Sequence, residues 1–165
     1  MTNKFGFACK WIDHAGQVDG IKPTDDCKKY NTGTTTVAWL NRQARSVAED
    51  KLWSLMKQNI EATRRLVQRV GELDEHLRMV RISSDILPVY THDSYKYFWQ
   101  QGDVQDYAGR AFAQVGDIAR DRNIRISFHP GQFCVLASDN EDIVARSIEE
   151  FEYHVDTVSY THLTL

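Results

Sequence analysis

Short runs of apolar residues, each bounded by polar or turn-forming residues, occur at three places along the chain. They lie at residues 4–9, 79–83 and 124–128, and the last two contain β-branched side chains. A run of this length between turn signals predicts a β-strand. We therefore expect three strands.

Longer stretches place apolar residues three and four positions apart, as on one face of an amphipathic helix. One such stripe runs from Leu52 to Val70 and is stopped by Gly71. Asp103 is expected to cap a second helix, and a capping box that begins at Ser138 is expected to start a third. The positions expected to face the core are Tyr107, Ala108, Ala111, Phe112, Val115, Ile118 and Ala119 in the second helix and Ile143, Val144, Ile148, Phe151 and Val155 in the third.

Strands and helices therefore alternate along the chain, and this order predicts an α/β fold with a parallel sheet. Residues 14–44, which are rich in Asp, Gly, Lys and Thr, are expected to form a long functional loop. No G-x-G-x-x-G or P-loop fingerprint follows any expected strand. At this point a doubly wound sheet and a β/α barrel are equally possible.

Composition narrows the class of protein only moderately. The chain has 165 residues, 42% of them hydrophobic, and no apolar run long enough to span a membrane. The three cysteines are widely scattered, and the N-terminus lacks the layout of a signal peptide, so we expect reduced thiols in a cytoplasmic protein. The net charge of −3 is mild evidence against non-specific nucleic-acid binding.

Two histidines follow neighbouring strands, where the active sites of β/α barrels lie. His129 comes directly after the third strand, and His92 lies in the loop after the second. Two imidazoles on adjacent strand ends can converge on one divalent metal ion. Spacing alone favours the alternative, in which His92 is a solvated loop residue and His129 a hydrogen-bonded turn residue.

A tight turn follows His129, because Pro130 and Gly131 restrict the backbone there. Gln132 and Phe133 come next, and an amide beside an aromatic ring could hydrogen-bond to and stack on unpaired bases. Phe133 could instead pack beneath the third helix.

These segments resemble the UV damage endonuclease family. The resemblance is carried by residues 126–133 (ISFHPGQF), by 80–84 (VRISS) leading through Leu87-Pro88 to His92, and by 6–9 (GFAC). It extends in order from about residue 4 to 156, and includes Arg146-Ser147 and Glu149-Glu150 in the third helix.

The resemblance implies a partial β/α (TIM-type) barrel, with about three strand–helix units of the eight in a closed barrel. It implies divalent metal ions, usually Mn²⁺, with His92 and His129 as ligands, and it assigns Gln132 and Phe133 to probing distorted bases. Phe7 falls at a DNA-contacting position where the family is expected to have tyrosine, and Trp11 stands where an asparagine is expected. The reaction implied is hydrolysis of the phosphodiester 5′ of a UV photoproduct, in double-stranded DNA, by a protein that is monomeric at full length and has no membrane contact.

The basic cluster of Arg64, Arg65 and Arg69 on the first long helix is interpreted as a solvated face rather than a DNA contact. Residues 1–157 are interpreted as the N-terminal part of a single barrel domain, which would be inactive alone because later ligands are missing. Residues 158–165 (VSYTHLTL) are interpreted as a non-native tail, because codons that encode them match the end of a transposon-derived sequencing adapter.

Two other functions remain open on this evidence. A metal-dependent sugar isomerase or epimerase of the same barrel type would use similar metal ligands but would have no use for an exposed Gln132-Phe133 pair. A small non-catalytic α/β binding module would fold cooperatively and would not depend on manganese.

Overall fold

A computed structural model describes residues 3–12, 25–128 and 134–161, with the backbone alone for Asp25, Tyr160 and Thr161. Its sheet contains β1 (Phe7–Ala8), β2 (Met79–Ile82) and β3 (Arg125–Phe128), in the order β1-β2-β3. Both pairings are parallel. The three predicted strands and the parallel sheet are thus confirmed, although β1 is shorter than the apolar run that predicted it.

The register places Phe7 opposite Val80 in β2, and Ile82 opposite Phe128 in β3. Gly6 precedes β1 at a point where the two strands come very close. A Cβ atom at Gly6 would lie 2.1 Å from the backbone oxygen of Met79. Only glycine fits this approach without a shift of the backbone.

Helix α3 (Arg45–Val70) confirms the predicted long helix and begins earlier than its apolar stripe does. Its buried side chains include Leu52, Met56 and Val67, which lie on one face and pack toward the sheet. Gly71 is its C-terminal cap, as predicted, but with φ −67° rather than the left-handed conformation. Glycine leaves room here for a neighbouring side chain, since a Cβ atom at Gly71 would lie 2.4 Å from the side chain of Arg122.

The long loop predicted before this helix has structure of its own. It contains α1 (Asp25–Lys28) and α2 (Val37–Leu40), two short helices. Thr36 caps α2, because its side-chain oxygen accepts a hydrogen bond from the backbone N–H of Trp39. Residues 13–24 lie outside the described ranges.

Between β2 and β3 the chain forms η3 (Ser84–Ile86), α4 (Lys96–Trp99) and α5 (Gly102–Asp121). The predicted cap of α5 is wrong by two residues, because the N-cap is Gln101 and Asp103 lies inside the first turn. The predicted apolar face is largely right. Its buried members are Ala108, Phe112, Val115 and Ala119. A further short 3₁₀ turn, η2 (Glu75–Leu77), joins α3 to β2.

Helix α6 (Glu141–Thr161) continues beyond Val155, the last apolar position predicted for the third helix, and includes residues 158–161. Its cap is Asn140, whose Oδ1 accepts hydrogen bonds from the N–H groups of Asp142 and Ile143, so the capping box predicted at Ser138 is wrong.

The predicted apolar face of α6 is also wrong. Ile148, Phe151 and Val155 are exposed, whereas the buried residues are Ser147, Tyr153, His154 and Thr157. Three of these satisfy their polar groups inside the helix. Ser147 Oγ donates to Ile143 O, Thr157 Oγ1 donates to Tyr153 O, and His154 Nδ1 lies 2.6 Å from Glu150 O. Because their hydrogen bonds are made locally, these side chains can be buried at little cost.

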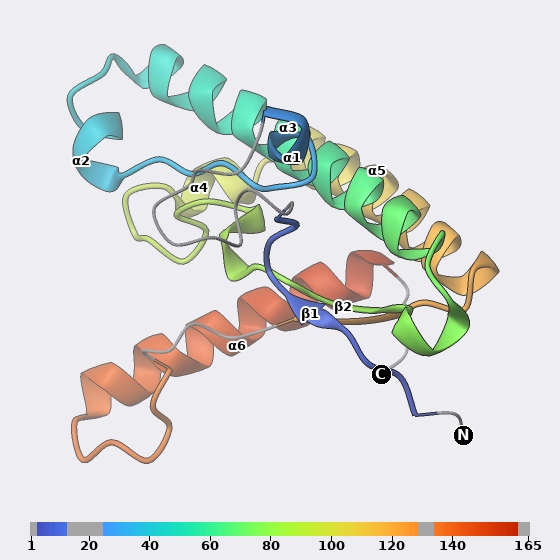
Figure 1. Cartoon of the computed structure of the whole chain (residues 1–165). Helices are drawn as coiled ribbons and strands as arrows, with labels where there is room; N and C mark the ends of the chain where they lie inside the picture. Colours follow the sequence, from blue (N-terminus) through green and yellow to red (C-terminus); the bar gives the residue numbers. More distant parts are fainter. Residues whose placement is uncertain (1–2, 13–24, 129–133, 162–165) are drawn as a thin grey trace.

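Figure 1 shows α3 and α5 side by side along the sheet, and α6 packs against α5. The order of the helices thus follows the order of the strands. A continuous core of apolar side chains from α3, β2, α4 and α5 fills the space between them. The chain therefore has an α/β fold with a parallel sheet, as predicted, and the closed or open form of the parent sheet stays a prediction. Within the described ranges, no helix is both long and apolar enough to cross a membrane.

Candidate functional site

The carboxyl ends of the three parallel strands lie at one edge of the sheet, and the loop that carries His92 starts there. We call residues 83–96 the His92 loop. It leaves β2 after Ile82, passes through η3 and reaches the first residue of α4. His92 is exposed to solvent. This placement agrees with the position expected for a functional residue of a β/α fold.

The backbone of His92 is held by a compact turn. Its N–H donates to Val89 O at 3.1 Å, and its carbonyl accepts from the N–H groups of Tyr95 at 2.8 Å and Lys96 at 3.0 Å. Val89 has φ 55°, a left-handed conformation that is unfavourable for a β-branched residue. Such a conformation persists only where the surrounding contacts impose it. The turn that presents His92 is therefore defined by its attachments to the rest of the molecule.

The His92 ring also has a defined hydrogen bond. Its Nδ1 atom accepts from the backbone N–H of Ser94 at 3.2 Å. In a neutral imidazole one nitrogen donates while the other accepts, so this contact leaves the ring proton on Nε2. A metal at Nε2 would require that proton to move to Nδ1 and the Ser94 contact to open. A metal at Nδ1 would take the place of the Ser94 N–H.

His92 lines a cavity of about 810 Å³ between the His92 loop and α6. The cavity joins chain segments that follow different strands, since Cys134 comes after β3 and Arg146 and Glu149 belong to α6. Its lining also includes Asp93, beside His92. The cavity thus offers an imidazole, carboxylates and a guanidinium on one surface.

Lys96 forms ion pairs with two residues that line this cavity, Asp93 and Glu149. Lys96 Nζ lies 2.9 Å from Asp93 Oδ1 and 2.9 Å from Glu149 Oε1. The hydrogen bond to Glu149, followed by that to Asp93, raises the pKa of Lys96, and Lys96 in turn lowers the pKa of Asp93. These shifts favour the charged forms of Lys96 and Asp93. The lysine joins the His92 loop to α6 through Glu149.

The described residues alone do not make a metal site. Within them, no three or more His, Cys, Asp or Glu side chains are arranged to hold an ion. His92 could serve as one nitrogen ligand, but further ligands would have to come from residues outside the described ranges or outside this chain.

The other predicted site residues have different outcomes. His129, Gln132 and Phe133 lie outside the described residues. Phe7 lines a second cavity of about 550 Å³. There its ring packs edge-on against Trp11, with the two ring centroids 5.5 Å apart. The structure therefore does not bring Phe7 to the cavity that His92 lines, and its predicted contact with DNA stays a prediction.

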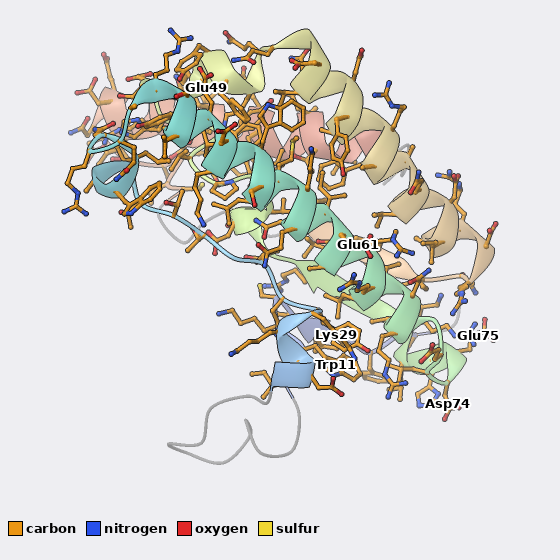
Figure 2. The ribbon with its side chains drawn as sticks, turned by 90° about the horizontal axis from the view of Figure 1, so that it is seen from above. Trp11, Lys29, Glu49, Glu61, Asp74 and Glu75 are labelled. Atoms are coloured by element: carbon orange, nitrogen blue, oxygen red, sulfur yellow. The ribbon has the colours of Figure 1, made fainter. Side chains whose placement is uncertain are left out.

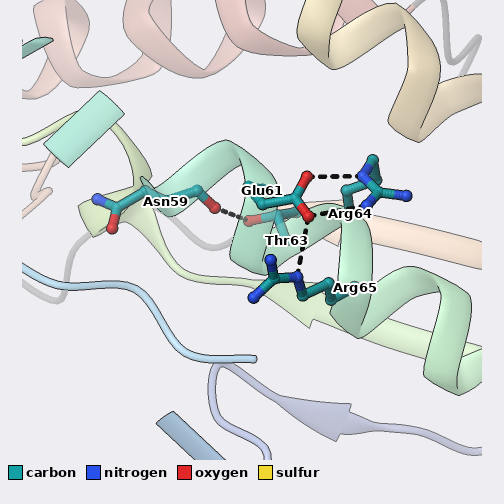
Figure 3. Close-up of polar contacts among 5 residues, drawn as sticks. All are labelled: Asn59, Glu61, Thr63, Arg64 and Arg65. Carbon is teal, nitrogen blue, oxygen red and sulfur yellow. Dashed lines mark hydrogen bonds and ion pairs between the residues drawn. The ribbon is translucent and has the colours of Figure 1, made fainter. Parts of the chain in front are cut away.

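The basic cluster on α3 is paired with carboxylates. Glu61 accepts hydrogen bonds from both Arg64 and Arg65, as Figure 3 shows, and Arg69 pairs with Glu72 at 2.7 Å. Seen from above in Figure 2, Glu61 lies along α3. This arrangement agrees with the interpretation of a solvated face, because each arginine already pairs with a carboxylate.

Sequence reasoning gave no role to Lys96, Asp93 or Glu149. Glu149 was noted only within the family resemblance, and Lys96 lies 53 residues before it. One signal was available, because Glu149, Tyr153 and Asp156 recur four and three positions apart and so share one face of a helix.

Comparison of the sequence with known protein families shows which family this chain belongs to. The family model described as UV-endonuclease UvdE matches residues 3–164. The chain belongs to this family. The resemblance seen in the sequence is thus confirmed, and it argues against a sugar isomerase and against an unrelated binding module.

Relatives and a solved structure agree with this assignment. The chain is 33% identical over 133 residues to a UV DNA damage endonuclease of Bacillus thuringiensis subsp. konkukian (strain 97-27), covering 78% of this chain and 38% of that protein. It is 30% identical over 127 residues to a UV DNA damage endonuclease of Clostridium perfringens (strain 13 / Type A), covering 76% of this chain and 29% of that protein. The structure titled "Crystal Structure of SacUVDE" superposes with a TM-score of 0.72 at 20% identity, covering 98% of this chain and 46% of that one. This UvdE-family chain therefore spans well under half the length of the relatives it matches.

Proposed function

We propose that this chain is part of a metal-dependent DNA-repair endonuclease that incises the phosphodiester 5′ of UV photoproducts in double-stranded DNA. The observation that carries the proposal is the match to the UvdE family over residues 3–164, with relatives that are named UV DNA damage endonucleases. The cavity at the carboxyl ends of the strands supports it, because it places His92 where such a fold carries its chemistry.

In this proposal His92 and His129 are metal ligands, and Mn²⁺ is the expected ion. A bound divalent ion would supply an activated water and would offset charge on the phosphodiester. The chain's own contribution is to hold the imidazole at the cavity. Because Nδ1 of His92 accepts from Ser94, ligation requires a change in this hydrogen bond. Binding should therefore perturb the Ser94 amide as well as the ring.

Recognition of the lesion is assigned to Gln132, Phe133 and Phe7, as the family resemblance implies. A damaged duplex is easier to kink and unstack than an intact one, so a glutamine–phenylalanine pair could discriminate by filling the opened stack. We further propose that the parent protein is a β/α barrel, monomeric and cytoplasmic. The consecutive parallel order β1-β2-β3 supports the barrel.

The test is an incision assay on a chimera, because this chain spans only part of its relatives. The chain would replace the matching segment of the Bacillus thuringiensis relative, and a 5′-labelled duplex would be irradiated and incubated with Mn²⁺. We expect cleavage 5′ of the photoproducts. His92→Ala and His129→Ala should each lower the incision rate at least about 100-fold, as expected for loss of a ligand.

His76→Ala is the matched control, since His76 is an exposed histidine in η2, before β2 rather than after it. It should incise at the unsubstituted rate. A chimera that folds and cleaves irradiated DNA equally well with and without His92 would show that the metal assignment is wrong. A folded chimera that cuts only elsewhere than 5′ of the lesion would overturn the proposed reaction.

A further inference from the structure

We propose that one edge of helix α6 is a positioning element for His92. This edge consists of Glu149, Tyr153 and Asp156. Each of these side chains contacts the His92 loop. The inference deepens the proposed function, since it assigns to α6 the task of placing a candidate metal ligand.

Tyr153 attaches the start of the loop. Its side chain is only 2% exposed, and its hydroxyl donates to Ser84 O at 2.9 Å and accepts from the N–H of Leu87 at 3.3 Å. Burial raises the pKa of this hydroxyl, so it remains protonated and able to donate. One phenol thus satisfies two backbone groups in a segment without regular strand pairing.

The middle and the end of the loop are attached by the two carboxylates. Tyr90 Oη donates to Asp156 Oδ2 at 3.2 Å, and the Tyr90 ring lies 4.6 Å from the ring of Tyr153. Lys96, at the end of the loop, pairs with Glu149. The attachments therefore lie on both sides of His92, with Tyr90 only two residues before it.

The loop is also attached at Ile86, whose O accepts from Asn59 Nδ2, and at Tyr95, whose hydroxyl donates to Asn41 Oδ1. His92 itself lies in the exposed part of the loop between these points. The histidine and the two residues after it are exposed, and the hydrogen bonds described above for its backbone and ring stay within the turn. The left-handed φ of Val89 shows that the turn is imposed from outside. Lys96 also contacts Asp93, so the same ion-pair network reaches the neighbour of the histidine.

The experiment is NMR spectroscopy of the ¹⁵N-labelled chain without metal. Amide hydrogen exchange reports the attachment of residues 83–96, and long-range proton–nitrogen correlations of the imidazole report the environment of His92. Tyr153→Phe keeps the ring but removes the hydroxyl. It should speed exchange of the Leu87 amide by about tenfold, which corresponds to one lost hydrogen bond, and shift the His92 ring signals. Exchange in the centre of α3 should not change.

Charge variants test the second attachment. Lys96→Gln should shift the His92 ring signals, whereas Lys96→Arg should restore them. Glu149→Gln should resemble Lys96→Gln. Glu141→Gln is the matched control, because Glu141 is an exposed carboxylate at the start of the same helix and should leave the His92 signals unchanged.

The outcomes separate this inference from the proposed function. Unchanged His92 signals in both Tyr153→Phe and Lys96→Gln would overturn the inference. Exchange that accelerates equally in α3 would also overturn it, because general destabilisation would then explain the effect. Adding Mn²⁺ to the unsubstituted chimera, which supplies the later part of the fold, tests the ligand role separately, through paramagnetic broadening of the His92 signals. A lack of broadening would count against the proposed function and leave the metal-free result intact.

Discussion

Asn59 makes the sharpest prediction about stability, because a single buried amide joins three parts of the fold. It lies on α3 with no exposed surface. Its Oδ1 accepts from the N–H of Gly33 at 2.8 Å, and its Nδ2 lies 2.9 Å from Gly33 O and 3.1 Å from Ile86 O. The amide therefore connects the helix both to the segment before α2 and to the beginning of the His92 loop.

The expected loss in the free energy of unfolding follows from the polar groups that would lose their hydrogen-bond partner. Asn59→Ala removes the acceptor of one half-buried N–H and the donor to carbonyl oxygens, one of them in a buried hydrogen bond, and each unsatisfied buried group costs about 1–3 kcal/mol. We expect a loss of about 3–4 kcal/mol in the free energy of unfolding, a large part of the total for a typical domain. Asn59→Asp should be at least as damaging, because its second carboxylate oxygen would face the carbonyls of Gly33 and Ile86.

Urea unfolding followed by tryptophan fluorescence would measure this loss, since the chain has 4 tryptophans. Gln58→Ala provides the control on the adjacent exposed position and should change stability by less than about 0.5 kcal/mol. A loss below about 1 kcal/mol for Asn59→Ala, or an Asn59→Asp variant as stable as the original chain, would refute the account of the buried amide.

Three further predictions concern local features. Gly6→Ala should loosen β1 from β2, because its Cβ would meet Met79 O, and faster amide exchange confined to residues 5–9 and 79–82 would verify it. Hydrogen bonding by its arginine partners lowers the pKa of Glu61 from 4.5, so its stabilisation is present above that value and is lost as the pH falls through the lower, folded-state pKa. Because this carboxylate is 38% exposed, Glu61→Gln should cost only about 0.5 kcal/mol at pH 7 in urea unfolding, and the difference should vanish in acid; a difference that grows in acid would contradict the sign. Asn140→Ala should lower the free energy of unfolding by about 1 kcal/mol, and Ser138→Ala by clearly less, in thermal or urea unfolding. A larger loss for Ser138→Ala would instead support the capping box expected from the sequence.

Sequence alone determined the strands, the main helices and their order. Short apolar runs and helical spacing are local signals, and they predicted these elements correctly because β2, α3 and α5 bury most of the side chains that the pattern marked. The family was also readable from the sequence, since its motifs are contiguous. His92 was placed correctly after its strand for the same reason.

Tertiary structure decided how α6 is used and what holds His92. The apolar stripe of α6 predicted a core-facing side, yet the helix buries Ser147, His154 and Thr157 and exposes Phe151. The pattern could not reveal this, because the polar groups of the buried residues are satisfied within the helix and so lose their usual cost of burial. The contact between Lys96 and its partner on α6 spans 53 residues, and no local periodicity records such a distance. Local interactions thus specify the helices and strands. The buried face of α6 and the attachment of the His92 loop depend instead on contacts between segments that are distant in the sequence.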